Sequence, residues 1–440
     1  MRADESLVLQ LQPELRTPVP GPASRTWSVR AAHVAAPMGP RLPPGTTPHT
    51  LVLSRGSGVN LWDVDGNRLV DLAAGFGSLL LGHGHPAVRR ATDVQGDRLW
   101  QAMGDLFPAD AKVGLLERLC ELLPGTNAKG ILGQSGADAV SAALKTALLV
   151  TGRPGVIALG GAYHGLSYGP LAVCGLRASY REPFSEQLNA HVEWVPYPST
   201  PETAEACVEQ VRRLLSGGGF GALIFEPVLG RGGVQPMLPE AAQALRAATS
   251  EHGALLIADE IWTGLGRSGQ WLYSRELGLA PDLICLGKGL GGGLPISACL
   301  GPADLMNAWS RSQEVVHTST FSGAPLACAT ALATLDVLGR GGLIDRARSI
   351  GDWWREQLTQ KLSPLGVRVR GRGMMIGLDV GDKAGAASRV MFALLGKGYL
   401  TSTGGGARET LVLTPPLIAE RAVLEPFADV LISVLSRPVQ

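Results

Sequence analysis

Short segments that are apolar at every position constrain the fold of this chain more than any other feature. Four of them lie in its middle, at 156–159, 222–225, 255–258 and 283–286. The stretch 239–252, between the second and the third, has the apolar spacing of a helix. A strand with no polar position must be covered on both faces, which is typical of a parallel sheet between helices. The sequence therefore predicts an α/β domain whose mainly parallel sheet is covered by helices.

The rest of the chain is organised around this domain, which we expect at 91–335. Residues 1–50 are rich in proline and show no periodicity, so they are predicted to form an N-terminal arm. Residues 51–90 include a hairpin with its turn at Asp65–Gly66 and form the N-terminal part of a smaller domain. Residues 336–440 are expected to complete that smaller domain as an α+β unit.

Composition excludes several classes of protein. Lys and Arg number 39 against 38 Asp and Glu, so the basic excess of a nucleic-acid or membrane-surface binder is missing. Charged residues are only 18% of the chain, which a large buried interface, and hence an oligomer, would explain, and a large globule would explain in part. The six cysteines form no C-x-x-C pair, which predicts reduced thiols in a cytoplasmic protein. No apolar run has the length of a membrane span.

Ionisable residues directly follow three of the apolar segments. Glu226 follows the second, Asp259 and Glu260 the third, and Lys288 the fourth. The carboxyl ends of parallel strands meet at one edge of the sheet, where ligands collect. Each residue alone could be a solvated loop charge, but an acid and a lysine that face one cleft indicate chemistry.

Lys288 is the most informative of these residues because it lies between glycines that let the backbone approach a bulky group. A desolvated lysine has a lowered pKa and can attack an aldehyde to form a Schiff base. Asp259 could then pair with a pyridinium nitrogen and keep that ring protonated as an electron sink. Together the two residues indicate a phosphorylated pyridine aldehyde as cofactor.

The phosphate of such a cofactor needs a cradle, and the segment 133–138 opens a predicted helix at 137–150. The first N–H groups of a helix bind anions. Ser135 with Asp138 is also a capping box, so a purely structural role stays open. Tyr163, in the glycine turn after 156–159, could stack on a planar ring.

Two other site types are disfavoured. Gly287, Gly289 and Gly292 match the dinucleotide-binding fingerprint, but another strand rather than a helix is predicted to follow them. His83 and His85 could bind a metal, but no further ligand stands at metal spacing, so no metal site is expected.

Several segments of the chain resemble those of one family, the class III or ω-aminotransferases, which are pyridoxal-phosphate enzymes of fold type I. The resemblance covers about 58–425, most of the chain. It is carried by the following segments: NLWDVDG at 60–66, LGHGHP at 81–86, QSGADA at 134–139, ADEIWTGLGRSG at 258–269, Lys288, and HTSTFSG at 317–323.

The resemblance implies a role for each matching position. Lys288 would form the aldimine with pyridoxal phosphate and move the substrate Cα proton, and Asp259 would pair with the ring nitrogen. The other residues implied in cofactor binding are Ser135, Gly136 and Ala137 at the phosphate, Tyr163 and Ile261 on the two ring faces, His164 and Glu226 near the ring, and Thr320, which would reach the cofactor of the other subunit in a homodimer. The residues implied in the substrate pocket are Phe76, Trp100 and Trp262.

The chain also departs from the family pattern. Ala137 replaces the usual Ser or Thr, which removes one phosphate hydrogen bond, and Trp262 replaces a position often held by Gln. Val412 stands where many members carry an arginine that binds the substrate carboxylate. Arg408 is expected to replace that arginine, with Arg231 as a further candidate, and Glu226 would then need another partner.

These observations together predict an aminotransferase. It would move an amino group from a small-molecule amine or amino-acid donor to a keto or aldehyde acceptor, through a Lys288 aldimine and pyridoxamine phosphate. We expect a cytoplasmic homodimer with no nucleic-acid or membrane partner. A pyridoxal-phosphate isomerase, either an amino-acid epimerase or an aminomutase, would use the same lysine and aspartate and stays open as the alternative.

Overall fold

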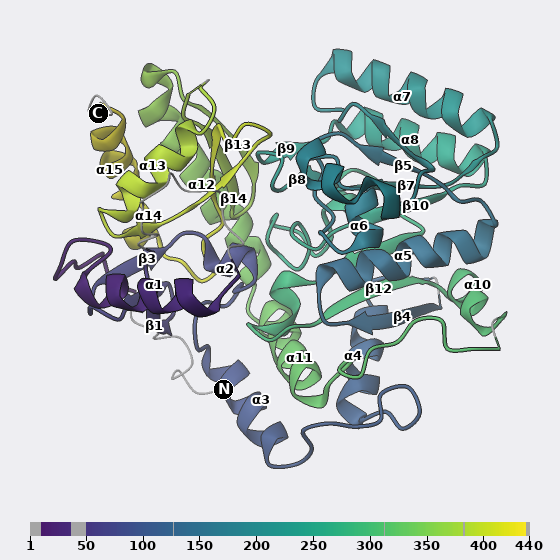
Figure 1. Cartoon of the computed structure of the whole chain (residues 1–440), viewed down its shortest axis with the longest axis horizontal. Coiled ribbons are helices and arrows are strands. Elements are labelled where there is room, and N and C mark those ends of the chain that lie inside the picture. The colour runs from purple at the N-terminus through teal and green to yellow at the C-terminus, as the bar shows by residue number, and fades with distance from the viewer. Residues whose placement is uncertain (1–9, 37–49, 126, 312, 382, 437–440) are drawn as a thin grey trace.

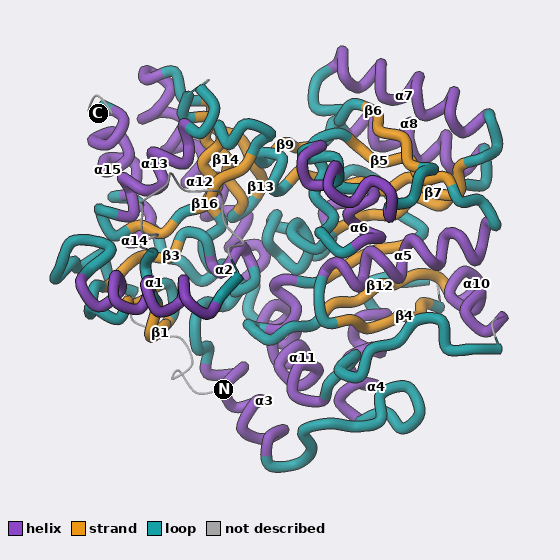
Figure 2. Tube along the Cα trace, viewed as in Figure 1, coloured by secondary structure: helices purple, strands orange, loops and turns teal. Residues whose placement is uncertain are grey.

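The computed structural model describes residues 10–36, 50–125, 127–311, 313–381 and 383–436. These residues build a large part around one seven-stranded sheet and a smaller part around two four-stranded sheets. The strands of the two parts form separate groups, with loops and helices between them (Figure 2). This arrangement confirms the predicted α/β fold with a second, smaller α+β unit.

The large sheet contains all four predicted strands. They are neighbours in the sheet and run parallel to one another, as expected. One strand, β12, is antiparallel to both of its neighbours. In order across the sheet the strands are β4 (Ala128–Gly133), β12 (Ser297–Pro302), β11 (Leu283–Leu286), β10 (Leu255–Asp259), β7 (Phe220–Phe225), β5 (Gly155–Leu159) and β6 (Val192–Val195).

Helices cover both faces of this sheet, as the apolar strands require. On one face α5 (Gly136–Thr151) packs on Leu255 and Ile257, and on the other α7 (Pro201–Ser216) and α8 (Pro239–Glu251) pack on Leu256 and Ala258. The helix α5 begins at the Ser135 cap and ends at Gly152, whose φ of 69° suits a glycine. The predicted helices at 137–150 and 239–252 are thus confirmed within two residues at each end.

Three more helices pack together beside the β4 edge of the large sheet (Figure 1). They are α3 (Pro86–Gly96), α4 (Asp110–Cys120) and α11 (Pro325–Arg340). The long α12 (Leu343–Leu362) then leads into the smaller part. Within the described ranges, no single helix has the length and apolar character to cross a membrane, and only α11 taken with the 343–365 segment meets that test, across a bend of 69°.

The smaller part joins segments from both ends of the chain. The parallel pairing of β15 with β3 places residue Tyr399 opposite Val70. The predicted hairpin is confirmed, since β2 and β3 are antiparallel and Gly66 at the turn has φ of 82°. The elements of this part are β1 (Leu53–Ser57), β2 (Asn60–Asp63), β3 (Arg68–Asp71) and β15 (Tyr399–Leu400) in one sheet, β13 (Arg368–Arg372), β14 (Met375–Asp379), β17 (Thr410–Leu413) and β16 (Ser402–Gly404) in the other, and α13 (Ala386–Leu395) and α15 (Phe427–Leu435).

The remaining short elements connect these units. They are α2 (Ala74–Gly77), α6 (Tyr168–Ala172), β8 (Val228–Leu229), β9 (Gln235–Pro236), α9 (Tyr273–Glu276), α10 (Ala303–Met306) and α14 (Arg421–Leu424).

The described part of the first fifty residues is more regular than the sequence indicated. Residues Pro22–Val34 form the helix α1, which lies along the smaller part (Figure 1). The Asp65 carboxylate accepts hydrogen bonds from Ala23 N at 2.7 Å and Ser24 N at 2.8 Å, so a residue of the hairpin turn caps this helix. The Asn67 side chain likewise accepts from Arg16 N and Thr17 N. The expectation of an aperiodic segment is therefore wrong for residues 22–34.

Candidate active site

Three ionisable side chains at the strand ends of the large sheet line one cavity of about 270 Å³. They are Glu226 after β7, Asp259 at the end of β10 and Lys288 after β11. The three strands are parallel neighbours, so their carboxyl ends meet at one edge, as the sequence predicted. Glu260 is not part of this cavity, because its carboxylate accepts hydrogen bonds from Ser274 N and from the Thr263 hydroxyl.

Lys288 enters the cavity from a tight turn. It begins the 3₁₀ turn Lys288–Gly291, and its own φ of 39° is uncommon for a residue with a Cβ atom. Its amine lies 4.4 Å from the centroid of the Trp262 ring. Burial lowers the pKa of Lys288, against the opposing effect of the Asp259 and Glu226 carboxylates. A larger share of this amine is therefore neutral, and able to accept a proton, than in an exposed lysine.

Asp259 is held by two partners and is only 4% exposed. Its Oδ2 lies 2.8 Å from His164 Nδ1, and its Oδ1 accepts a hydrogen bond from Ile261 N at 3.0 Å. A carboxylate can only accept, so the proton of this contact is on His164 Nδ1. The His164 Nε2 atom is buried and has no partner in the described chain. The carboxylate is thus fixed in position beside Lys288.

Glu226 is buried and bonded to the backbone rather than to an arginine. Its Oε1 accepts from Tyr163 N at 2.7 Å and its Oε2 from Gly230 N at 2.9 Å. The pKa of Glu226 is raised to about 7, mainly by burial; the nearby Asp259 charge adds to this rise, while His164 and the two backbone hydrogen bonds oppose it. Val412, fully buried in β17, offers no cation to Glu226. The two N–H groups therefore take the place of the arginine partner that is missing.

The N-terminus of α5 forms another wall of the cavity, through Ser135, Gly136 and Ala137. The capping box is present as well, since Ser135 Oγ accepts from Asp138 N and Asp138 Oδ2 accepts from Ser135 N. The capping role is therefore confirmed, and the phosphate-binding role of the same segment stays a prediction. A Cβ atom on Gly136 would lie 2.9 Å from Ile261 Cδ1, so a glycine is required for this close approach.

Aromatic and aliphatic side chains complete the cavity wall. Tyr163, Ile261 and Trp262 were expected there, whereas Leu166 was not. Trp262 is 7% exposed and fits only because Gly77 and Gly230 lack side chains: a Cβ atom on either would lie 2.2 Å from the indole. The buried Trp262 Nε1 has no hydrogen-bond partner in the described ranges.

Four of the expected site residues do not reach this cavity within one chain. The side chains of Phe76 and Trp100 are 63% and 70% exposed, and Thr320 and Arg408 are also exposed. Arg231 lies closer, with its guanidinium carbon 4.8 Å from the centroid of the Tyr163 ring. Leu166 follows Tyr163 and His164 directly in the sequence, so its position in the same loop was the signal that could have identified it.

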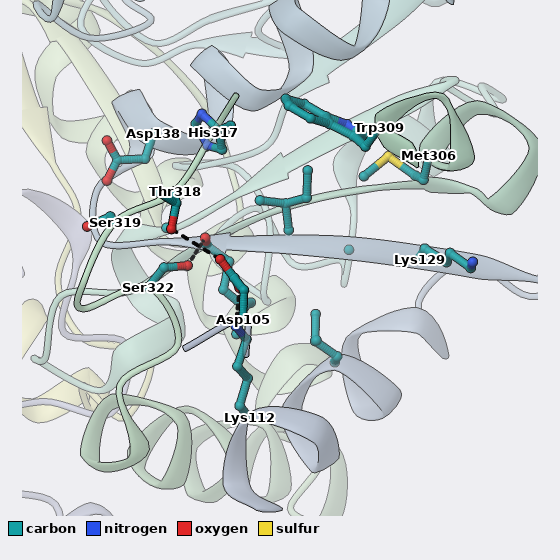
Figure 3. A pocket seen from close by; sticks show the side chains of 15 residues that line it. Asp105, Lys112, Lys129, Asp138, Met306, Trp309, His317, Thr318, Ser319 and Ser322 are labelled. Carbon is teal, nitrogen blue, oxygen red and sulfur yellow. Dashed lines mark hydrogen bonds and ion pairs between the residues drawn. The ribbon is translucent and has the colours of Figure 1, made fainter. Parts of the chain in front are cut away.

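A second cavity, of about 370 Å³, adjoins the same turn before α5 (Figure 3). Gly133 and Asp138 line it, together with the 317–322 segment and Asp105. Asp105 accepts hydrogen bonds from Lys112 at 2.8 Å and from the Thr318 hydroxyl at 3.2 Å. The segment that carries Thr320 is therefore anchored beside the helix N-terminus that lines the first cavity.

The residues of the two disfavoured site types, the glycine motif and the histidine pair, have other roles in the structure. After β11 the glycine motif forms a 3₁₀ turn and then the antiparallel β12, which is not the geometry of a dinucleotide-binding unit. His83 Nε2 contacts Asp71 Oδ2 at 2.7 Å, and His85 caps α3. Among the residues the structure describes, no cluster of His, Cys, Asp and Glu could hold a metal ion.

Comparison with known proteins identifies the family. The model of the family "Aminotransferase class-III" matches residues 42–435. The 2-aminoadipate transaminase of Pseudomonas putida is 36% identical over 399 residues, which cover 87% of this chain and 95% of that protein. An acetylornithine aminotransferase of Streptomyces coelicolor is 36% identical over 394 residues, covering 89% of this chain and 92% of that protein.

Solved structures agree with the sequence relatives. An amine transaminase from an uncultivated Pseudomonas species, determined with pyridoxal phosphate bound, has a TM-score of 0.82 at 32% identity and covers 91% of this chain and 96% of its own. The ornithine aminotransferase of Toxoplasma gondii has a TM-score of 0.82 at 27% identity and covers 93% of each chain. The chain is a member of the class III aminotransferases, which are pyridoxal-phosphate enzymes of fold type I, and it catalyses transamination.

Proposed function

We propose that Lys288 holds the aldehyde of pyridoxal phosphate and moves the proton at the substrate Cα, and that Asp259 pairs with the pyridine nitrogen. The observation that carries this proposal is the common cavity of the two residues, in which a buried amine with a lowered pKa lies near a fixed carboxylate. An aldehyde cofactor needs a partly neutral amine, and a pyridinium needs a carboxylate that cannot turn away.

The rest of the cavity fits the same cofactor. A phosphate group would lie at the N-terminus of α5, where the Gly136 and Ala137 N–H groups have no partner within the helix. Ala137 offers no hydroxyl, whereas the Ser135 hydroxyl, which accepts from Asp138 N, keeps its O–H donor. Backbone N–H groups and this one hydroxyl would therefore bind the phosphate. Ile261 and Tyr163 line the same cavity and would pack on the faces of the pyridine ring.

When bound, the cofactor supplies an electron sink for the carbanion that forms at the substrate Cα. Lys288 would accept the Cα proton as a general base and return it, as a general acid, to the cofactor carbon that carried the aldehyde. The Asp259 carboxylate would hold a proton on the ring nitrogen, and His164 keeps this carboxylate in place. Trp262, against the Lys288 amine, excludes water from the reacting side.

We further propose that the active enzyme is a homodimer in which Thr320 contributes to the partner's phosphate site. Two segments joined by the Gln101–Thr320 and Asp105–Thr318 hydrogen bonds expose many large apolar side chains. We call them the apolar surface: Leu99, Trp100, Met103, Leu106, Phe107, Val315, Val316 and Phe321. Exposed apolar patches of this kind mark interfaces, and Phe76 and Trp100 would then border the partner's cavity.

The substrate is proposed to be a small-molecule amine or ω-amino compound as donor, with a keto compound as acceptor. Val412 cannot hold a carboxylate in the pose that an arginine there would impose, and the bulk of Trp262 narrows the cavity. Of the relatives named above, the acetylornithine aminotransferase is named for a compound whose free amine lies far from its carboxylate, and that name supports an ω-amino donor. The six free cysteines support a reducing, cytoplasmic location.

The test is the first half-reaction. Purified enzyme loaded with pyridoxal phosphate is mixed with single amine donors, without an acceptor, and its absorbance is followed. A transaminase converts its cofactor to the amine form and keeps it there until a keto compound is added. An enzyme that exchanges substrate protons but never accumulates the amine form of the cofactor would be an isomerase, and the proposed reaction would be wrong.

A further inference from the structure

We propose that Arg231 binds a carboxylate group of the substrate, so that this enzyme selects amino acids and keto acids over amines without a carboxylate. The inference rests on the proposed function and deepens it by naming the chemical group that the substrate must carry.

Arg231 lies at the edge of the active-site cavity. It follows Gly230, whose N–H donates to Glu226 Oε2 at 2.9 Å. Its guanidinium carbon is 4.8 Å from the ring centroid of Tyr163, a residue that lines the cavity. The positive charge of Arg231 also acts on Lys288, where it lowers the pKa after the larger effect of burial. A carboxylate bound to this guanidinium would therefore be close to the reacting amine.

The Arg231 side chain has no hydrogen-bond partner, whereas those of the other partly buried arginines in the described chain bond to a carboxylate or to backbone carbonyls. Arg246 and Arg370 are also partly buried, and each pairs with an aspartate, Asp282 and Asp379 respectively. Arg231 forms no ion pair and no side-chain hydrogen bond among the residues that the structure describes. A guanidinium that has lost part of its water and gained no carboxylate is a ready partner for the carboxylate of a ligand.

The acids of the cavity do not satisfy this cation. Glu226 accepts from the backbone of Tyr163 and Gly230, and Asp259 from His164 and Ile261. Both carboxylates are thus fixed by other donors. An arginine is also the side chain whose planar fork matches a carboxylate in two parallel hydrogen bonds.

The backbone around Arg231 is rigid and passes close to Val412. The Arg231 carbonyl accepts from Gly405 N at 2.8 Å, and Gly233 N donates to Gly230 O at 3.2 Å. A Cβ atom on Gly404 would lie 2.9 Å from Val412 Cγ2 and 3.0 Å from the Arg231 carbonyl oxygen. The Arg231 backbone therefore passes close to Val412, the position where the expected arginine is missing.

The test compares donors that differ only in a carboxylate: L-ornithine against putrescine, and 4-aminobutyrate against 1-propylamine. The kcat/KM of the first half-reaction is measured for each compound with the wild-type holoenzyme and with Arg231→Met and Arg231→Lys. Arg231→Met should lower kcat/KM for the preferred carboxylated donor about 10- to 100-fold, the value of a charge-assisted hydrogen bond, and leave its carboxylate-free counterpart within about twofold. Arg231→Lys should recover part of the loss, because it keeps the charge without the fork.

Binding of glutarate to the holoenzyme gives a second readout that needs no turnover. Its Kd should rise about 10- to 100-fold in Arg231→Met. Arg421→Met is the matched control, because Arg421 stacks on Trp353 at the same 4.8 Å but lies on α14, outside the cavity lining. Cofactor affinity, measured in every variant, should not change.

Three results would overturn the inference: no wild-type preference for the carboxylated member of either pair, a glutarate Kd that Arg231→Met leaves unchanged, or a preference that Arg408→Met removes instead. Failure of the proposed function is distinct, because the holoenzyme would then convert neither member of any pair, while the effect of Arg231→Met on the glutarate Kd would still decide the role of Arg231.

Discussion

The active-site cavity and the apolar surface differ in how completely one chain satisfies their side chains. In the cavity, Asp259 and Glu226 are buried and their oxygens already have partners within the same chain. On the apolar surface, Leu106 and Phe107 are 73% and 69% exposed and nothing in the chain covers them within the described ranges. The reacting groups are thus positioned by one chain, whereas in the proposed homodimer Thr320 and its neighbours would be covered by a second copy.

This comparison makes Lys288→Ala the most damaging change. The cavity would lose both the amine that holds the cofactor and the group that moves the proton, so kcat/KM should fall by more than about 10⁴-fold while the dimer remains. Steady-state kinetics with the cofactor in excess measures the effect. Lys361→Ala, which removes a partly exposed lysine paired with Asp429, is the control and should have normal kcat/KM. Substantial activity in Lys288→Ala would remove this lysine from the mechanism.

Asp259→Asn should come next, with a loss of about 10²- to 10³-fold in kcat, the scale for removing one electrostatic group from a closed site. The amide keeps the shape of the side chain but cannot hold a proton on the ring nitrogen. The same variant should still bind the cofactor, as its absorbance band would report. A near-normal kcat would mean that the contact with His164 Nδ1 is structural only.

A change on the apolar surface should act on assembly first. The double substitution Leu106→Glu and Phe107→Glu places charges on both sides of a two-fold interface, so the dimer Kd should rise about 100-fold or more. Sedimentation velocity at several concentrations measures it, and activity should decline in parallel with the dimer. Phe392→Glu, on the equally exposed Phe392 of α13, should leave the dimer intact. A fully active monomer would contradict the role of Thr320.

The smallest expected effect concerns Glu226 and pH. Its folded-state pKa of about 7 lies above the ordinary value of 4.5, mainly because of burial, so the folded protein binds more protons than the unfolded one between these values. Stability should therefore fall as the pH rises through this window. Between about pH 5 and pH 8, wild-type protein without cofactor should lose about 2 kcal/mol more unfolding free energy than Glu226→Gln. Denaturant unfolding measures both, and identical pH profiles would show that the Glu226 carboxyl is ionised throughout.

The parts of the fold that the sequence predicted are those set by local pattern. Uninterrupted apolar runs indicated β5, β7, β10 and β11, and because the carboxyl ends of parallel strands meet at one edge of the sheet, Asp259 and Lys288 were expected to face one cleft. The helix α1 was missed because its cap, Asp65, lies more than forty residues away in the sequence. No local pattern records such a partner.

The residue types at the strand ends indicated which side chains line the cavity, but the sequence did not indicate which contacts depend on the backbone. The partners of Glu226 are two N–H groups, which the sequence does not distinguish from any others. Trp262 fits only against Gly77 and Gly230, which are distant in sequence. Phe76 and Thr320 lie outside the cavity of their own chain, so their expected roles depend on the geometry of a dimer and stay predictions.

The most direct test of the proposed site is to find which amine holds the cofactor. Holoenzyme is reduced with borohydride, which makes the bond between cofactor and lysine permanent, and is then digested and mapped by mass spectrometry. The peptide that contains Lys288 should carry the cofactor, and the wild-type adduct should be absent from Lys288→Ala. A cofactor fixed to another lysine, or to none, would contradict the assignment of Lys288.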